Sequence, residues 1–272
     1  MRKIVHLSDL HFGRVDERLL APLAERVRAL APDVVVVSGD LTQRARRRQF
    51  EQARAFLAQL PQPQIVVPGN HDVPLYNVAA RFFWPLAGFR RHITREPAPM
   101  FRDDALAVLG LNSARSLVLK NGRVNARQLA QVRDALCGLG DEVMKVVVTH
   151  HPFDLPPEHD HRALVGRAAL AMQTFASCGI DVLLAGHLHV SHSLDTGLRH
   201  PQAGYEALMV TAGTATSTRG RGERNAFNLL RLDKRFVQVE RYEWQPERAA
   251  FVSAECERFQ RAAHGWQPAP PA

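Results

Sequence analysis

Side chains that can bind metal ions or transfer protons occur in five short groups along the chain, each directly after an apolar run. The groups are Asp9 with His11; Asp40; Asn70 with His71 and Asp72; His150; and His187 with His189. Short β-branched runs that stop at Ser, Pro or Gly indicate buried strands that end abruptly. Ligands of open α/β sheets bind outside the carboxyl ends of the strands, so we expect these groups to share one site.

The types of side chain in these groups indicate the metals that they would bind. Imidazole and carboxylate without any thiolate suit Zn, Fe or Mn rather than Cu(I) or an iron–sulfur cluster. These residues are too many for one tetrahedral ion, and two ions that share a bridging carboxylate would use them economically. Two metals held roughly 3.5–4 Å apart are the usual device for hydrolysing phosphate esters.

The spacing within the groups has a structural interpretation. Asp9 and His11 are two residues apart, so an extended backbone would point both side chains to one side, and His187 and His189 repeat this spacing. Glycine permits a sharp turn and a close approach of the backbone to an ion. A glycine precedes a candidate ligand at Gly39, Gly69 and Gly186.

Each group taken alone has an ordinary structural explanation. Asp72 could cap a following turn or helix, and Asp40 could be a turn residue at the end of a strand. What favours a functional site is the conjunction, because successive strands from different parts of the chain all end in residues that can bind metal.

The apolar periodicity predicts alternating strands and helices first and strands alone last. Strands are expected at 4–7, 34–37, 65–67, 106–111, 145–148 and 180–184, helices at 16–30, 46–60, 126–136 and 166–177, and antiparallel strands at 205–211, 226–232 and 237–244. Residues 73–99 are less regular and predict a short helix with a long loop. This pattern favours an α/β fold in which two sheets pack together with helices outside.

Length and composition agree with one domain. The chain has 272 residues, of which 46% are hydrophobic, and we assign 1–260 to a single domain and 261–272 to a flexible tail rich in Pro and Ala. No apolar run reaches the roughly 18 residues of a membrane-spanning helix. Polar residues interrupt the first apolar run too early for a signal peptide, so we expect a cytoplasmic protein.

Cysteine usage and charge give weaker indications. Cys137, Cys178 and Cys256 are odd in number and far apart, so we expect free thiols rather than a disulfide. The formal net charge of +8 favours anionic partners such as phosphate esters, nucleic acid or an acidic membrane surface.

The five groups together resemble the calcineurin-like metallophosphoesterases. The matching motifs are DLH at 9–11, GD at 39–40, GNHD at 69–72, His150 within VVTHHPF, and GHLH at 186–189. The resemblance implies a four-layer α/β/β/α sandwich with two mixed β-sheets and outer helices. It also implies one ion on Asp9, His11 and His189, a second ion on Asn70, His150 and His187, and Asp40 as the bridge between them.

The resemblance further implies hydrolysis without a covalent intermediate. A hydroxide generated between the two ions would attack phosphorus in line with the leaving oxygen. His71 would face the scissile phosphate and either stabilise developing charge or protonate the leaving group. Asp72 would orient His71 through a hydrogen bond. His71 and Asp72 are therefore the expected catalytic pair.

Within this family the chain is most similar to bacterial class III cyclic-nucleotide phosphodiesterases. The similarity rests on GNHD, on GLNSAR at 110–115 and on GTATSTRGRGERNAFN at 213–228. It implies a small phosphorylated substrate, with a 3′,5′-cyclic nucleotide as the first choice. The candidate substrate contacts are Asn112, Arg115, His151 and the segment Arg219–Arg224.

Other substrates and partners stay open at this point. The aromatic residues within 82–89, beside Arg90 and Arg91, could hold an acyl chain and contact a membrane, as in a UDP-2,3-diacylglucosamine pyrophosphatase. That pyrophosphatase family typically has Arg where His71 stands. A nuclease would fit the basic charge. No DNA-capping domain is visible, so a nucleic acid is not the expected partner. The final strands could pair in a homodimer. A binding module without activity is disfavoured, because no motif position is lost.

Overall fold

The structure of the chain is a computed structural model. The described residues are 1–96, 98–117, 121–155, 164–196, 205–218, 222–263 and 265–270. Residues 219–221 of the expected contact segment Arg219–Arg224 lie outside this set. Within the described residues, no helix combines the length and the apolar character needed to cross a membrane.

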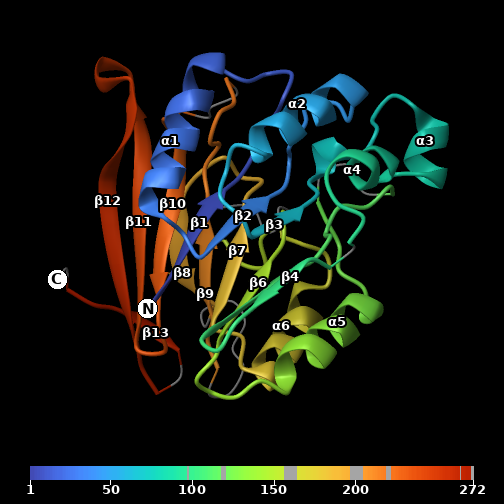
Figure 1. Cartoon of the computed structure of the whole chain (residues 1–272). Helices are drawn as coiled ribbons and strands as arrows, with labels where there is room; N and C mark the ends of the chain where they lie inside the picture. Colours follow the sequence, from blue (N-terminus) through green and yellow to red (C-terminus); the bar gives the residue numbers. More distant parts are fainter. Residues whose placement is uncertain are drawn as a thin grey trace.

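Two mixed sheets form the centre of the molecule (Figure 1). The first has the order β13-β12-β11-β10-β1-β2-β3. Its parallel part consists of β1 (Arg2–Leu7), β2 (Val34–Ser38) and β3 (Gln64–Val67). Its antiparallel part consists of β10 (Ala226–Leu232), β11 (Phe236–Gln245), β12 (Ala250–Arg261) and β13 (Trp266–Pro268).

The second sheet has the order β4-β5-β6-β7-β9-β8. Its central strands run parallel and are β5 (Leu106–Gly110), β6 (Met144–Val148), β7 (Val182–Ala185) and β9 (Leu208–Thr211). The edge strands β4 (Met100–Arg102) and β8 (His192–Asp195) are antiparallel to their neighbours. In both sheets, therefore, the strands that precede the predicted site residues run in the same direction.

Three apolar cores separate four layers. Alternate residues of a strand face opposite sides of its sheet, and the valine run of β2 shows this directly. Val34 and Val36 pack between the two sheets, whereas Val35 and Val37 pack outward against helices. Burial of both faces explains why this strand is apolar throughout, and each buried valine contributes about 1.5–3 kcal/mol.

Helices cover the outer face of each sheet. The helices α1 (Leu20–Leu30), α2 (Arg47–Leu57) and α4 (Ala87–His92) contribute to the core outside the first sheet. The helices α5 (Ala126–Val132) and α6 (Ala168–Cys178) contribute to the core outside the second sheet. This arrangement confirms the expected α/β fold with two mixed sheets and outer helices (Figure 1).

One expected strand direction is wrong. Residues 205–211 were expected to be antiparallel, but β9 pairs in parallel with β7. The reason is β8, which lies between them in the sequence and runs antiparallel to β9. The chain therefore reverses twice and returns to its original direction.

The expected flexible tail at 261–272 is also wrong for the residues that form β13. These residues extend the first sheet, and Trp266 is only 1% exposed. Its indole N–H donates a hydrogen bond to the carbonyl of Asp181 at 3.0 Å. A tryptophan that buries its ring and satisfies its donor holds this part of the chain against the sheets.

The cysteine expectation is wrong for two of the three residues. Cys137 and Cys178 form a disulfide, whereas Cys256 is an exposed free thiol. The helical segments that carry the paired cysteines lie side by side against the second sheet and bring their Cα atoms to 4.1 Å, although 41 residues separate them in the sequence.

Candidate metal centre

The predicted site residues follow the carboxyl ends of five strands from both sheets. Asp9 and His11 follow β1, Asp40 follows β2, and the 3₁₀ turn Asn70–Asp72 follows β3. His150 follows β6, and the pair His187 and His189 follows β7. Because strands of both sheets end here, the site spans the boundary between the two sheets.

The backbone at this site corrects one detail of the sequence interpretation. The paired residues were expected in extended backbone, but five site residues have left-handed conformations with φ between 50° and 73°, namely Asp9, His11, Asp40, His187 and His189. Residues other than glycine adopt this region rarely, at a cost of order 1–3 kcal/mol each, and such strain concentrates at functional sites. The sharp turns direct the side chains back across the strand ends.

Two of the glycines are required for space. A Cβ on Gly186 would lie 2.6 Å from Asp9 Oδ2 and would also collide with Ser8 Oγ. A Cβ on Gly69 would meet the backbone and carboxylate of Asp40. The expectation that glycines allow close approach at these positions is confirmed.

The first cluster contains Asp9, His11 and His189, and all three side chains are buried. Asp9 Oδ1 lies 3.2 Å from His189 Nε2 and 3.5 Å from His11 Nε2. The two Nε2 atoms of the histidines lie 3.3 Å apart. Three donor atoms therefore converge on a single point inside the protein.

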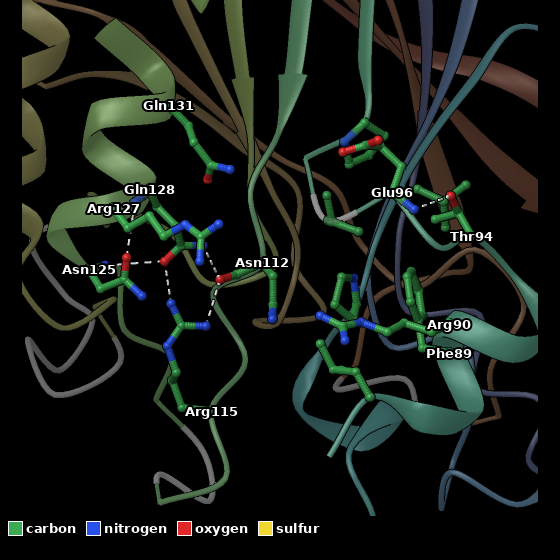
Figure 2. Close-up of a pocket in the computed structure, with 15 residues that line it drawn as sticks. Phe89, Arg90, Thr94, Glu96, Asn112, Arg115, Asn125, Arg127, Gln128 and Gln131 are labelled. Atoms are coloured by element: carbon green, nitrogen blue, oxygen red, sulfur yellow. Dashed lines mark hydrogen bonds between the residues drawn. The ribbon is translucent and has the colours of Figure 1, made fainter. Parts of the chain in front are cut away.

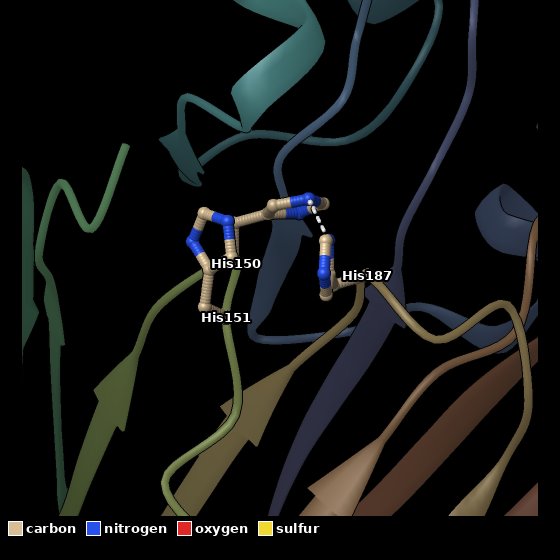
Figure 3. A group of neighbouring side chains, drawn as sticks. All are labelled: His150, His151 and His187. Atoms are coloured by element: carbon tan, nitrogen blue, oxygen red, sulfur yellow. Dashed lines mark hydrogen bonds between the residues drawn. The ribbon is translucent and has the colours of Figure 1, made fainter. Parts of the chain in front are cut away.

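The second cluster contains His150, Asn70 and His187. His150 Nε2 lies 3.1 Å from Asn70 Oδ1 and 3.3 Å from His187 Nδ1. Figure 3 shows the His150 and His187 rings pointing toward each other, with His151 beside them. The ring centroids of His151 and His187 are 4.6 Å apart.

Asp40 lies between the two clusters. Its Oδ1 accepts a hydrogen bond from the backbone N–H of His71 at 2.8 Å. Its Oδ2 lies 3.5 Å from His150 Nε2 and 3.8 Å from His11 Nε2. One carboxylate thus faces a histidine of each cluster, which is the position that a bridging ligand needs.

The residues present fit metal ions. Ligands at about 2.0–2.1 Å from an ion lie roughly 3.0–3.4 Å from one another, and the contacts within each cluster fall close to this range. Asp9 Oδ1 is buried and has no hydrogen-bond partner within the described residues. A buried carboxylate oxygen without a partner is costly unless a cation satisfies it.

Surrounding groups hold these ligands in place. Ser8 Oγ donates to Asp9 Oδ2 at 2.6 Å, and the backbone N–H of His187 donates to the same oxygen at 3.0 Å. His150 Nδ1 lies 2.8 Å from the carbonyl of Ser38, which fixes the tautomer that leaves Nε2 facing Asp40 and Asn70. Such supporting contacts are the usual companions of metal-binding histidines and carboxylates.

The electrostatics keep both carboxylates ionised. Burial alone would raise the pKa of Asp9, but the imidazoles of His11 and His189, whose Nε2 atoms lie 3.5 and 3.2 Å from Asp9 Oδ1, hold that pKa well below its usual value. Burial also opposes ionisation of Asp40, but the neighbouring charge of His150 lowers the pKa of Asp40 below its usual range. In turn, Asp40 outweighs the effect of burial and raises the pKa of His150 to about 9.

The pKa of His187 is shifted in the opposite direction from that of His150. Burial, with a smaller contribution from the charge of His150, lowers the pKa of His187 to about 4. A neutral imidazole and ionised carboxylates are the forms in which these groups bind a metal.

The expected hydrogen bond between the Asp72 carboxylate and the His71 ring is not the contact that Asp72 makes. The Asp72 carboxylate accepts hydrogen bonds from the backbone N–H groups of Leu41, Thr42 and Gly69 and from the Thr42 hydroxyl. It therefore ties the loop after β2 to the turn after β3 instead of binding the His71 ring. Burial, together with the charge of Asp40, raises the pKa of Asp72 to about 6.

The His71 ring has its own supports. Its Nδ1 lies 3.0 Å from the carbonyl of Gln43 and 3.2 Å from a guanidinium nitrogen of Arg44. Its Nε2 lies 3.9 Å from Asp40 Oδ2, and the side chain is 20% exposed. His71 thus faces the two clusters from a position that solvent can reach.

His151 lies closer to the metal centre than the sequence interpretation placed it. It was expected only as a substrate contact, but it could join His150 and His187 in a metal-binding group. Its Nδ1 lies 2.8 Å from the hydroxyl of Ser113, the residue after Asn112. The adjacent histidines in the THHP sequence are the signal that could have suggested this.

Of the other expected substrate contacts, the structure places some beside the metal centre and others away from it or outside the described residues. Asn112 and Arg115 line a pocket beside the metal centre, on the same side as Ser113. Arg224 is exposed on the surface, and Arg219 and Arg221 are outside the described residues.

Comparison with known proteins gives a family and a fold. Residues 2–191 match the family model described as calcineurin-like phosphoesterase. The purple acid phosphatase PPD1 from yellow lupin (Lupinus luteus) superposes with a TM-score of 0.71 at 12% identity, covering 96% of this chain and 54% of that chain. A dimetal phosphatase from Danio rerio superposes with a TM-score of 0.63 at 15% identity, covering 93% of this chain and 98% of that chain. At these identities the likeness shows the fold alone.

Two curated proteins are similar over short stretches. The glycerophosphodiester phosphodiesterase GpdQ of Enterobacter lignolyticus (strain SCF1) is 34% identical over an alignment of 80 residues that covers 25% of this chain and 29% of that protein. The UDP-2,3-diacylglucosamine pyrophosphatase LpxG of Chlamydia trachomatis is 32% identical over an alignment of 77 residues that covers 27% of this chain and 23% of that protein. The matched stretches thus span less than a third of either relative.

Proposed function

Since the chain belongs to the calcineurin-like phosphoesterase family, and is thus a metal-dependent phosphoesterase, we propose that it hydrolyses phosphodiesters with two metal ions. The observation that supports this most is the position of Asp40 between two clusters of metal-competent side chains. A single ion would leave one of the clusters without a cation. Two ions around a shared carboxylate are suited to in-line displacement at phosphorus.

In this proposal each cluster holds one ion. Asp9, His11 and His189 would hold the first, Asn70, His150 and His187 would hold the second, and Asp40 would be shared between them. Nitrogen and oxygen donors without thiolate suit Mn, Fe or Zn. When bound, such ions supply Lewis-acid stabilisation of the phosphoryl oxygens and lower the pKa of coordinated water.

His71 acts on the leaving group in this proposal. The contacts at Nδ1 with the Gln43 carbonyl and with Arg44 hold the ring, while Nε2 faces Asp40 and the space over both clusters. From there Nε2 can donate a hydrogen bond to a phosphoryl oxygen or a proton to the leaving oxygen. Asp72 acts indirectly, because it fixes the two loops that carry Asp40 and His71.

For the substrate we propose a small phosphodiester, with 3′,5′-cyclic nucleotides and glycerophosphodiesters as the first compounds to test. The cyclic nucleotide rests on the motifs at 69–72, 110–115 and 213–228, and the glycerophosphodiester rests on the similarity to GpdQ.

The test is turnover with added Mn on bis-p-nitrophenyl phosphate, p-nitrophenyl phosphate, cyclic AMP and glycerophosphoethanolamine. We expect cleavage of the diesters, loss of activity on chelation and its return with metal. Preference for the monoester, or full activity that survives complete removal of metal, would contradict the proposed phosphodiesterase.

A second candidate keeps the reaction and changes the substrate to a nucleotide-linked lipid. The supporting observation is a run of exposed apolar side chains directly after the site, in which Tyr76, Phe83 and Trp84 are 74%, 73% and 65% exposed. Such a surface suits an acyl chain or a membrane interface. Turnover of UDP-diacylglucosamine above that of cyclic AMP and glycerophosphoethanolamine would favour this candidate over the first.

A further inference from the structure

A pocket of about 270 Å³ opens beside the metal centre, between α4 and α5 (Figure 2). One wall consists of Leu86, Phe89 and Arg90 with the segment that follows α4. The opposite wall is formed by Asn112, Arg115 and residues at the start of α5. The edge strand β3 and Pro68 close the pocket between these walls.

Part of the polar lining is already engaged in a fixed network. Arg115 donates from one nitrogen to the carbonyls of Asn112 and Ala114, both at 2.9 Å, and from another to Gln128 Oε1. Gln128 in turn donates to the Asn112 carbonyl at 2.6 Å. All these acceptors are neutral, so the Arg115 charge has no carboxylate partner among the described residues.

Three further polar side chains of the lining have no partner among the residues that the structure describes. Within the described part of the chain, the side chains of Arg90, Arg127 and Gln131 form no hydrogen bond or ion pair. Figure 2 shows Arg90 extending from α4 toward the side of the pocket that carries Arg115, Arg127 and Gln131. Two arginines with unused donors thus border the same cavity from opposite walls.

The charge of the lining is strongly positive. Arg90, Arg115 and Arg127 line the pocket against one carboxylate, Glu96. Burial, with a contribution from Arg123, lowers the pKa of Arg115, which reflects a cation held without a counterion. Guanidinium groups bind phosphate through paired, charge-assisted hydrogen bonds, so an anion is the ligand that this lining fits.

The pocket adjoins the metal centre through its walls. Pro68 lines the pocket and precedes Asn70 by two residues. Asn112 also lines it, and the next residue, Ser113, contacts His151 Nδ1 at 2.8 Å. A ligand whose one end lies over the metal clusters can therefore extend past Pro68 and Asn112 into the pocket.

We propose that this pocket is a subsite for a second phosphate group of the substrate, held between Arg90 and Arg127 while the scissile diester lies at the metal clusters. The inference rests on the proposed phosphodiesterase function and narrows its substrate. A 3′,5′-cyclic nucleoside monophosphate carries one phosphate and would leave this subsite empty. A linear nucleotide diester with a terminal phosphate would fill both places, and Phe89 and Leu86 offer an apolar surface to the group between them.

The test compares two dinucleotides that differ by one phosphate, pApA and ApA, in the wild-type protein and in Arg90→Gln/Arg127→Gln. The matched control is Arg91→Gln, since Arg91 is exposed on the same helix and does not line the pocket. We expect wild type to cleave pApA with a kcat/KM at least about tenfold above that for ApA, as one charge-assisted contact would give. The double variant should lose this preference and retain its rate on ApA, whereas the control should retain both.

Bis-p-nitrophenyl phosphate separates this inference from the proposed function. If wild type cleaves it but shows no preference for pApA, or cleaves neither dinucleotide, the subsite is wrong and the phosphodiesterase stands. Equal losses on pApA and ApA in the double variant, with an unchanged melting temperature, would also overturn the subsite. If no diester is cleaved with any metal, the proposed function fails and the inference fails with it.

Discussion

Two neighbouring regions of this molecule reverse the usual distribution of polar and apolar side chains. At the metal centre Asp9, His11 and His150 are fully buried. In the aromatic rim, defined here as residues 75–84, Tyr76 and Phe83 are 74% and 73% exposed. Buried charged groups and exposed aromatic groups are both unfavourable unless a ligand compensates for them. The contrast separates a buried centre that can bind metal ions from an exposed apolar surface segment.

The two regions also differ in how the chain holds them. The metal centre takes residues from five strand ends, and residues as distant as Asp9 and His187 meet there. The aromatic rim is one continuous segment that includes α3 (Val78–Phe83). Arg81 helps to hold this segment in place, because its side chain donates hydrogen bonds to the carbonyls of Ser116 at 2.7 Å and Pro74 at 3.1 Å. A rigid site suits the reaction, and a surface segment suits the choice of substrate.

Loss of the bridging carboxylate should have the largest effect. In Asp40→Asn we expect turnover of bis-p-nitrophenyl phosphate to fall by more than about 100-fold, beyond the 10–100-fold typical of residues that only support a ligand. The reason is that Asp40 faces both clusters. Steady-state kinetics with excess Mn measure this, and the exposed Asp104→Asn is the control. Near-wild-type turnover in Asp40→Asn would remove Asp40 from the centre.

A methyl group at the metal centre should have the next largest effect. In Gly186→Ala the added Cβ collides with Ser8 and Asp9, so the carboxylate must move. We expect about a 10–100-fold loss of metal affinity, as for disruption of a supporting contact, measured by titration of the metal-free protein with Mn. Gly138→Ala is the matched control, since nothing lies within 4 Å of its Cβ position. Equal affinities in the two variants would contradict the close packing around Asp9.

Burial near the metal centre should also make stability depend on pH. Burial lowers the pKa of His6 to about 3, and its Nε2 lies 2.9 Å from Ser38 Oγ. The folded state therefore excludes a proton that the unfolded state binds below about pH 6.5. The stabilisation is complete above that pH and declines as the pH falls toward 3, by about 1.4 kcal/mol per pH unit.

This decline can be measured by urea unfolding of the metal-free protein between pH 7.5 and 5. We expect the free energy of unfolding to fall less steeply below pH 6.5 in His6→Gln than in wild type. Parallel pH dependences in the two proteins would mean that His6 accepts a proton in the folded state.

The aromatic rim should give the smallest effect on the reaction itself. In Phe83→Ser/Trp84→Ser we expect bis-p-nitrophenyl phosphate turnover within about twofold of wild type and a change in stability within about 0.5 kcal/mol per site. If the substrate carries a lipid, its KM should rise while kcat stays constant. A large loss on the small diester would show that the rim and the centre are not separate in function.

The residues that the structure brings together at the centre could be recognised in the sequence because their signals are local. Short apolar runs that end in His, Asp or Asn mark strand ends, and parallel strands bring such ends together. The left-handed backbone of Asp9 and His189 was not predictable, since it depends on packing between the two sheets. The same holds for Asp72, whose hydrogen bonds reach backbone groups some 30 residues away.

Elements without a local signal were missed or misjudged. Strand β12 is long, but only Phe251 and Phe259 of its 12 residues are buried, so its sequence lacks apolar alternation. The disulfide between Cys137 and Cys178 depends on how two helical segments pack, which spacing in the sequence does not reveal. The direction of β9 depends on β8, which has no apolar run of its own.

The most direct test of the two-cluster centre is the number of metal ions bound per chain. Metal-free protein would be titrated with Mn, with bound metal measured by elemental analysis and turnover of bis-p-nitrophenyl phosphate measured at each step. We predict that full activity requires two ions per wild-type chain and that Asp40→Asn does not reach this occupancy at the same free Mn. Full activity with one ion per chain, or two ions retained equally by Asp40→Asn, would contradict the account.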